Sequence, residues 1–212
     1  MIPRSYTAWL VPLALTLVSV CSTARATAQS IYPFTGNYST TVNITPITDN
    51  ISQVVETGES LDAPYGLNKY DGLTYSLTDA NGNLSFNNTP EAFGIQGYPL
   101  GYIVFGDGTN KLFGLGDASA VLNPETLTGK GSGVVNITGG EGIFKNATGT
   151  LLYSEDDKVL LGQNITLNGL ALVSGSIQSQ QVPEPGNTAT LVSIGVIGLG
   201  LLLRHHSKVK AV

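Results

Sequence analysis

The chain has 212 residues, of which 12% are charged and 26 are glycine. This length accommodates one domain plus processing segments, and abundant glycine with few charges is typical of a turn-rich β-protein. The single cysteine, Cys21, and the two histidines, His205 and His206, lie near the two ends of the chain. The region between them therefore cannot build a disulfide, a Ser-His-Asp or Cys-His catalytic triad, or a zinc site with nitrogen or sulfur ligands.

Residues 1–28 have the three parts of a secretory signal peptide. Arg4 gives a positive start, the apolar core LVPLALTLVSV spans Leu10–Val20, and Ala26 and Ala28 are small residues at the positions that signal peptidase reads. We expect cleavage after Ala28. The alternative is a short membrane anchor that stays uncleaved, but the apolar run is shorter than the roughly 20 residues that span a bilayer.

The region from Gln29 to Val182 is strongly acidic. It carries 14 aspartate or glutamate residues against 5 lysines and no arginine, a net charge near −9. Such a surface repels phosphate backbones, so we do not expect nucleic acid as a partner.

Residues 29–181 are expected to form one extracytoplasmic all-β domain. Leu73–Thr78 alternates apolar and polar residues, and Asn81-Gly82 leads into a further strand at Asn83–Phe86. Asn-Gly between two such runs predicts a tight hairpin, because both residues accept a positive φ. The segments Asp62–Asp71 and Thr89–Pro99 combine proline, glycine and aromatic residues and are predicted to be irregular loops.

A second hairpin is predicted where Gly101–Phe105 and Lys111–Leu115 flank a glycine-rich loop. Frequent strands joined by Gly, Asn and Asp turns indicate a single antiparallel barrel or sandwich, of which we favour the barrel. The remaining predicted strands are Val134–Thr138, Ile143–Tyr153, Lys158–Leu161 and Ile165–Ile177.

Acidic residues cluster at two places that could be considered for calcium. Asp79 alternates with Asn81 and Asn83, which the Asn-Gly turn explains better, and the full calcium-loop pattern is absent. Glu155-Asp156-Asp157 is interpreted as a solvated hairpin loop. We therefore predict no metal site, no cofactor and no catalytic residue.

Residues 137–150, ITGGEGIFKNATGT, combine a Gly-Gly-x-Gly-x-Phe turn with a following Ala-x-Gly strand. This segment resembles the glycine-rich strand pair of the allene oxide cyclase and dirigent barrels. The resemblance implies a barrel fold. Glu141 and Lys145 replace the small and arginine residues of that pattern, so no catalytic residue is carried over from it.

The C-terminal region, residues 182–212, has three parts in sequence: a Pro-Glu-Pro motif, an uncharged apolar run at 188–203, and a basic tail. The apolar run predicts a transmembrane helix, and the basic residues after it place the C-terminus on the cytoplasmic side. With a signal peptide in front, the middle domain then lies outside. The motif residues are Val182, Pro183, Glu184 and Pro185, and the topogenic basic residues are Arg204, Lys208 and Lys210.

This tail resembles the PEP-CTERM sorting signal of bacterial exported proteins, and the whole chain resembles a group of cyanobacterial exported proteins. The resemblance implies an exosortase-type transpeptidase as a partner. Cleavage near the Pro183-Glu184-Pro185 motif would transfer the domain to the cell surface or the extracellular matrix. The alternative is a single-span membrane anchor that is never processed, which needs the same apolar helix and basic tail.

Three functions follow from these observations. The leading hypothesis is a non-enzymatic exported protein of the cell surface or an exopolysaccharide matrix. The second is a barrel that binds a small apolar ligand, which requires a cavity lined by Phe, Tyr, Leu and Val side chains. The third is a carboxylate-based carbohydrate-active enzyme, which requires two carboxyl groups roughly 5–10 Å apart across a cleft.

Overall fold

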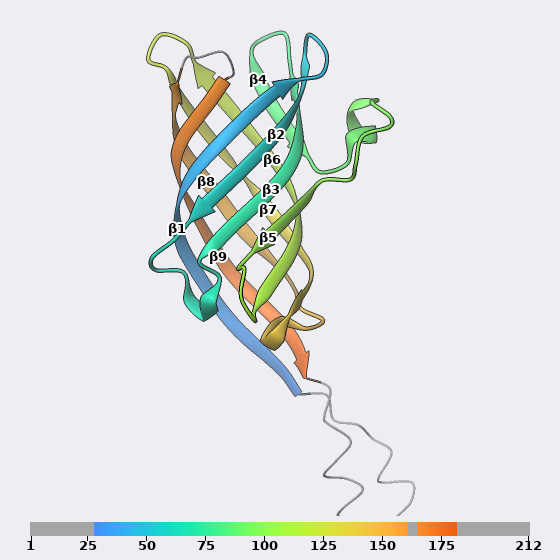
Figure 1. Ribbon diagram of the computed structural model, residues 1–212, viewed down its shortest axis with the longest axis vertical. Helices are drawn as coiled ribbons and strands as arrows, with labels where there is room; N and C mark the ends of the chain where they lie inside the picture. The colour runs from blue at the N-terminus through green and yellow to red at the C-terminus, as the bar shows by residue number, and fades with distance from the viewer. Residues whose placement is uncertain (1–27, 161–164, 182–212) are drawn as a thin grey trace, which may run out of the picture. The chain divides into compact units, whose positions relative to one another are not determined.

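The computed structural model describes residues 28–160 and 165–181, which form one antiparallel sheet of nine strands (Figure 1). The prediction of an all-β, antiparallel fold is confirmed. Within these ranges there is no helix long and apolar enough to cross a membrane, and the predicted signal peptide and transmembrane helix lie outside them. The strands are β1 (Ala28–Pro46), β2 (Ile51–Glu59), β3 (Lys69–Thr78), β4 (Asn83–Asn87), β5 (Tyr102–Phe105), β6 (Lys111–Asn123), β7 (Thr128–Glu141), β8 (Thr148–Leu160) and β9 (Ile165–Gln181).

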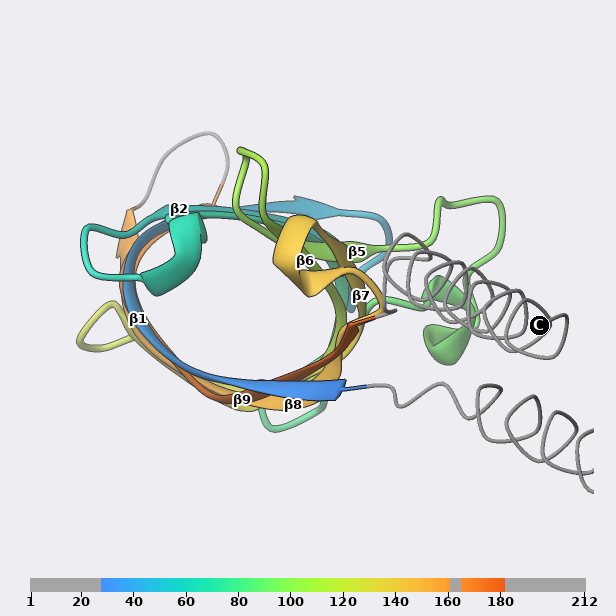
Figure 2. The ribbon, with the colours of Figure 1, turned by 90° about the horizontal axis from the view of Figure 1, so that it is seen from below.

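The sheet closes on itself, so that the strands form a ring (Figure 2). The strand order runs β2-β1-β9-β8-β7-β6-β4-β3, and β3 pairs back to β2. β4 and β5 share one position in the ring, because each pairs with β3 on one side and β6 on the other. Closure leaves every strand with a neighbour on both sides, which removes the open edges through which sheets aggregate.

Asn88 bridges the break in the wall between β4 and β5. Its buried side chain donates from Nδ2 to the carbonyl of Leu73 at 2.7 Å and accepts the Gly116 N–H at Oδ1. Its own carbonyl accepts the Gly101 N–H at 2.7 Å. The asparagine thus supplies hydrogen bonds that the interrupted ladder cannot, and the chain between β4 and β5 projects outward as a loop that contains a short 3-10 turn, η2 (Pro90–Phe93).

Both predicted hairpins are present. β3 and β4 are joined through the Asn81-Gly82 turn, where Gly82 has a φ of +82° and donates its N–H to the Asp79 carbonyl at 3.0 Å. β5 and β6 pair across the second glycine-rich turn. These turns are local features, which is why alternation and turn chemistry found them.

Several boundary predictions are wrong. β6 extends to Asn123 and β7 spans Thr128–Glu141, beyond the strands predicted at 111–115 and 134–138. The loop predicted at Asp62–Asp71 contains the 3-10 turn η1 (Pro64–Gly66), but its last residues, from Lys69 on, already belong to β3. The strand predicted from Ile143 starts at Thr148, because Gly142–Phe144 forms a third 3-10 turn, η3. That turn carries Phe144 into the interior, where the side chain is fully buried.

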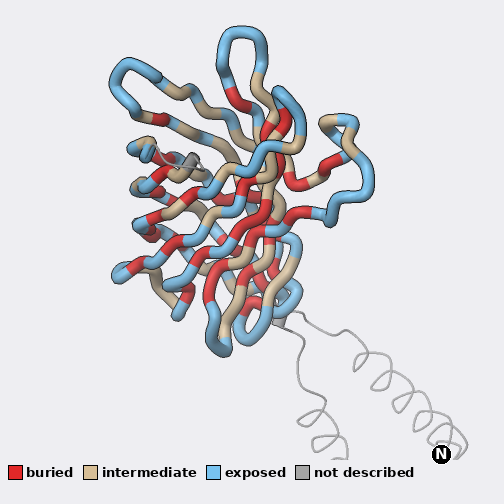
Figure 3. The backbone as a smooth tube through the Cα atoms, turned by 45° about the horizontal axis from the view of Figure 1, so that its top comes forward, coloured by how far each residue is buried: buried red, intermediate tan, exposed pale blue. Residues whose placement is uncertain are grey.

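The half of the interior nearest the start of β1 and the end of β9 is solidly packed. Phe105 lies at its centre, with ring centroids 6.0 Å from Phe34, 5.8 Å from Tyr38 and 5.2 Å from Tyr70. Along the strands, buried residues alternate with exposed ones, as expected for a sheet with one enclosed face (Figure 3). This half therefore forms an aromatic core.

Candidate functional site

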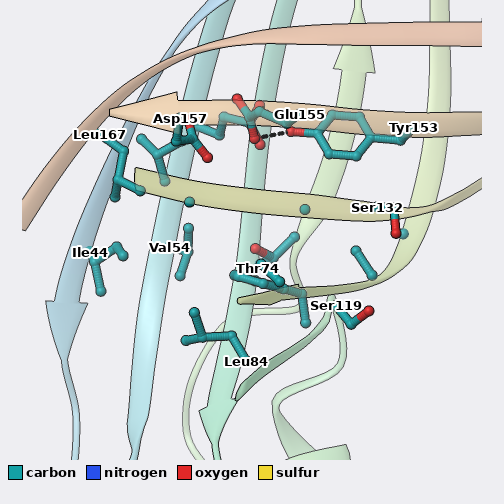
Figure 4. A pocket seen from close by; sticks show the side chains of 18 of the residues that line it. Ile44, Val54, Thr74, Leu84, Ser119, Ser132, Tyr153, Glu155, Asp157 and Leu167 are labelled. Carbon is teal, nitrogen blue, oxygen red and sulfur yellow. Dashed lines mark hydrogen bonds between the residues drawn. The ribbon is translucent and has the colours of Figure 1, made fainter. Parts of the chain in front are cut away.

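The other half of the ring encloses a cavity of about 80 Å³ (Figure 4). It lies toward the end with the β1–β2, β3–β4 and β6–β7 turns. Most of its wall is aliphatic or aromatic, as required by the hypothesis of an apolar-ligand barrel. The main apolar side chains are Val42 and Ile44 from β1, Val54 from β2, Leu84 and Phe86 from β4, Leu122 from β6, and Leu167 from β9.

The cavity exists because β6 and β7 present small residues to the interior. Ala120 on β6 pairs with Gly131 on β7, and Ala118 and Gly129 also line the cavity, at positions where leucine- or phenylalanine-sized side chains would fill the space. A Cβ at Gly131 would meet the Ala120 Cβ at 3.6 Å, an ordinary contact. The backbone at Gly131 therefore has room for a larger residue, and the effect of glycine there is to leave the cavity unfilled.

Three carboxyl groups also line the cavity. Glu56 comes from β2, and Glu155 and Asp157 come from β8 (Figure 4). The interpretation of Glu155-Asp156-Asp157 as a solvated hairpin loop is wrong. The segment lies within β8 and pairs with β7 and β9 on its two sides. Alternation then turns Glu155 and Asp157 inward, whereas Asp156 points outward and forms an ion pair with Lys130 at 2.8 Å.

Hydroxyl groups connect two of these carboxyls into one cluster. Tyr153 Oη lies 3.0 Å from Glu56 Oε1 and also contacts Glu155 Oε2, and Tyr70 Oη donates to Glu56 Oε2 at 3.2 Å. Thr40 Oγ1 donates to Glu155 Oε1. Because Tyr153 has one hydroxyl hydrogen, it can donate to only one of its two carboxyl neighbours. Its contact with the other is a hydrogen bond only if that carboxyl is protonated.

Asp157 is less well satisfied than its neighbours. Its Oδ1 atom is buried and has no hydrogen-bond partner among the described residues. A hydrogen bond with the adjacent Glu155 would require a proton on one of the two carboxyls. Gly169 on β9 makes room for the group, since a Cβ there would lie 2.2 Å from Asp157 Oδ1.

Burial controls the ionisation of the cluster. It raises the pKa of Glu56 well above its ordinary value, and the charge of Glu155 adds to the effect. Burial, followed by the proximity of Glu155, raises the pKa of Asp157 to about 7. The phenol pKa values of Tyr70 and Tyr153 are raised for the same reason, so both hydroxyls stay protonated.

No lysine or arginine of the described residues lines the cavity. Lys69 and Lys111 form ion pairs on the outer surface, with Glu59 at 3.2 Å and Glu141 at 3.0 Å. The interior acids therefore have no cationic side chain among the described residues to neutralise them, and burial reduces their solvation. This combination is what favours their protonated forms.

The residues of the predicted sorting motif, basic tail and signal cleavage site lie outside the described ranges, except Ala28 at the start of β1. The residues considered for calcium form a turn. The Asn83 side chain donates from Nδ2 to Asp79 Oδ2 at 2.9 Å, and Asp79 Oδ1 accepts the backbone N–H groups of Asn83 and Asn81 at 2.9 and 2.8 Å. These hydrogen bonds lower the pKa of Asp79. Within residues 28–160 and 165–181, no cluster of His, Cys, Asp and Glu is arranged to hold a metal.

Sequence reasoning missed the interior cluster of Thr40, Glu56, Tyr70, Tyr153, Glu155 and Asp157. One local signal was present, because Tyr153, Glu155 and Asp157 continue the alternation that begins with the apolar Leu151. An acidic residue on the apolar phase of a strand indicates either a misplaced strand or a functional interior. Only the pairing of distant strands shows which.

No family model and no curated protein matches the sequence. The structure is loosely similar to that of a pterocarpan synthase dirigent protein, with a TM-score of 0.36 and 9% sequence identity, over 73% of this chain and 93% of that one.

Proposed function

We propose that the protein is an exported, surface-held binding protein, and that its ring of strands is a barrel that takes a small, mainly apolar ligand. This proposal depends on the interior of the ring. Aromatic side chains fill one half of it, and the other half contains a cavity with mostly apolar walls. Larger apolar residues at the successive inward glycine and alanine positions would fill the cavity and stabilise the fold. Retaining small residues there is therefore explained by a ligand that occupies the space.

The size of the cavity limits its occupant. Pockets for drug-sized molecules measure roughly 300–1,000 Å³, and this one measures about 80 Å³. We therefore propose a ligand with one small ring or a short alkyl chain, or the end of a longer molecule that extends through the opening. The carbohydrate-active alternative is not favoured, since Glu56 and Glu155 share the Tyr153 hydroxyl and do not face each other across a cleft.

Filling the cavity should abolish binding. In the substitution Gly131→Leu, the new Cβ has room and the isobutyl group projects into the space that a ligand would occupy. We expect benzyl alcohol to bind the wild-type full-length chain and to bind Gly131→Leu at least tenfold more weakly. Isothermal titration calorimetry measures both affinities, and amide chemical shifts locate the probe.

Asn136→Leu is the matched control, because it adds the same side chain to the exposed face of the same strand. It should leave probe binding unchanged. Equal binding by Gly131→Leu and the wild type, or chemical-shift changes confined to the outer surface, would refute the proposed cavity function.

The export part of the proposal rests on the two terminal regions of the sequence. We expect intact-mass analysis of native cells to find a surface or extracellular species that lacks Met1–Ala28 and the residues that follow the Pro183-Glu184-Pro185 motif. Such a species would support sorting by an exosortase-type enzyme. A membrane species that retains residues 204–212 would instead identify the tail as an ordinary anchor.

A further inference from the structure

The polar wall of the cavity has an unbalanced composition. Glu56, Glu155 and Asp157 face the cavity, and the part of the chain that the structure describes contributes no basic side chain to it. The titratable neighbours from the surrounding strands are Tyr70 on β3 and Tyr153 on β8, both with raised pKa values. The adjoining positions on β1 and β9 hold Thr40 and Gly169, which carry no charge.

The cluster also has too few hydrogen-bond donors. Three hydroxyl groups, from Thr40, Tyr70 and Tyr153, serve six carboxyl oxygens. Asp157 Oδ1 is buried and has none of them. A buried acceptor without a donor is costly, at roughly 1–3 kcal/mol, and this one belongs to a residue that lines the cavity.

We propose that the cavity selects a ligand with a protonated amine, whose ammonium group binds between Glu56, Glu155 and Asp157 while its apolar remainder lies against Val42, Val54 and Leu167. This inference rests on the proposed binding function and names the chemical class of the ligand. An ammonium group supplies three N–H donors and one positive charge. It therefore provides what the cluster lacks.

Other polar groups fit less well. A carboxylate ligand would add a further negative charge beside three acids, and a neutral hydroxyl would supply a single donor and leave the charges unbalanced. An inorganic cation would need several oxygens converging on one point, which the described residues do not offer. The apolar side of the cavity also has no oxygen ligands to offer an inorganic cation.

Amine binding should release protons. The ammonium ion favours the ionised carboxyls, so it must displace protons that burial keeps on Glu56 and Asp157. Affinity is then high where the free cluster is largely ionised and falls as the pH drops below about 7. Binding of a neutral ligand in the same cavity would not follow this dependence.

The test compares benzylamine, benzyl alcohol and benzoate with the full-length wild-type chain by isothermal titration calorimetry. At about pH 8 we expect benzylamine to bind at least tenfold more tightly than benzyl alcohol, and benzoate not to bind. At about pH 5.5 the preference for the amine should decrease to threefold or less. Titrations in buffers of different ionisation enthalpy should show net proton release when the amine binds.

Asp157→Asn should weaken benzylamine binding about tenfold at pH 8 and weaken benzyl alcohol binding much less, whereas the matched outer-face variant Asp156→Asn should leave the binding of both probes unchanged. If the alcohol binds as tightly as the amine at every pH, the amine proposal is overturned and the cavity function stands. If neither probe binds the wild-type protein, both proposals are overturned. The pH series and the proton count use the wild-type protein, so they remain decisive if a variant fails to fold.

Discussion

The protein should be more stable toward urea at pH 5 than at pH 8, and the interior carboxyl cluster should account for the difference. Asp157 has an ordinary aspartate pKa near 4 when the chain is unfolded and a pKa of about 7 when it is folded. The folded state therefore binds more protons between these values, and stability is lost as the pH rises through that window. Glu56 contributes with the same sign, because its pKa is also raised.

The size of this effect is limited by solvent near Asp157. After allowance for screening, we expect Asp157 to contribute about 1–2 kcal/mol to the difference in unfolding free energy between pH 5 and pH 8. Asp157→Asn should remove that contribution, since asparagine imitates the neutral side chain at every pH. Urea denaturation at the two pH values measures it.

General repulsion among the many surface acids also lowers stability at high pH, so a control for lost negative charge is needed. Asp156→Asn removes the same charge from the neighbouring outward position, where the ion pair with exposed Lys130 contributes little. It should leave most of the pH dependence intact. Equal flattening by both variants would show that the interior location of Asp157 has no special effect.

The largest loss of stability should come from Phe105→Ala. Phe105 is fully buried and packs against Phe34, Tyr38 and Tyr70, so truncation leaves a hole that the surrounding strands cannot close. We expect a loss of about 3–5 kcal/mol in unfolding free energy, measured by urea denaturation.

Phe113→Ala is the matched comparison. Phe113 on β6 pairs with Val104 on β5 and is only partly buried. Its truncation should cost about 1 kcal/mol. A similar cost for the two variants would mean that the aromatic half of the interior is not the stabilising core that its packing indicates.

The sequence was sufficient for features that depend on neighbours along the chain. The Asn81-Gly82 turn, the β5–β6 hairpin and the antiparallel all-β class all follow from alternation and turn chemistry. The positions of η3 and Phe144 were missed because the turn is set by what Phe144 packs against, chiefly Tyr32 and Tyr65.

The cavity and its acids could not be predicted in the same way. Glu56 and Glu155 are 99 positions apart and meet only because the ring closes through β1 and β9. Before that closure is known, Glu155 is one acid in the run Glu155-Asp156-Asp157, and three consecutive acids favour the interpretation of a solvated loop. The roles of the glycines on β7 and of Gly169 on β9 can be recognised only in the structure. The former leave space for the cavity, and Gly169 leaves space for the Asp157 carboxyl group.

Because the ring is closed, the chain could begin at a different strand and still form the same sheet. β1 and β9 are neighbours, and the side chains of Gln29 and Gln178 are joined by a hydrogen bond of 2.7 Å across that seam. A short peptide could connect the first strand to the last, and bridging so small a gap would cost little chain entropy. The folded ring thus does not require β1 to be the first strand of the chain. A circularly permuted chain that begins and ends at the β3–β4 turn should form the same core and the same cavity.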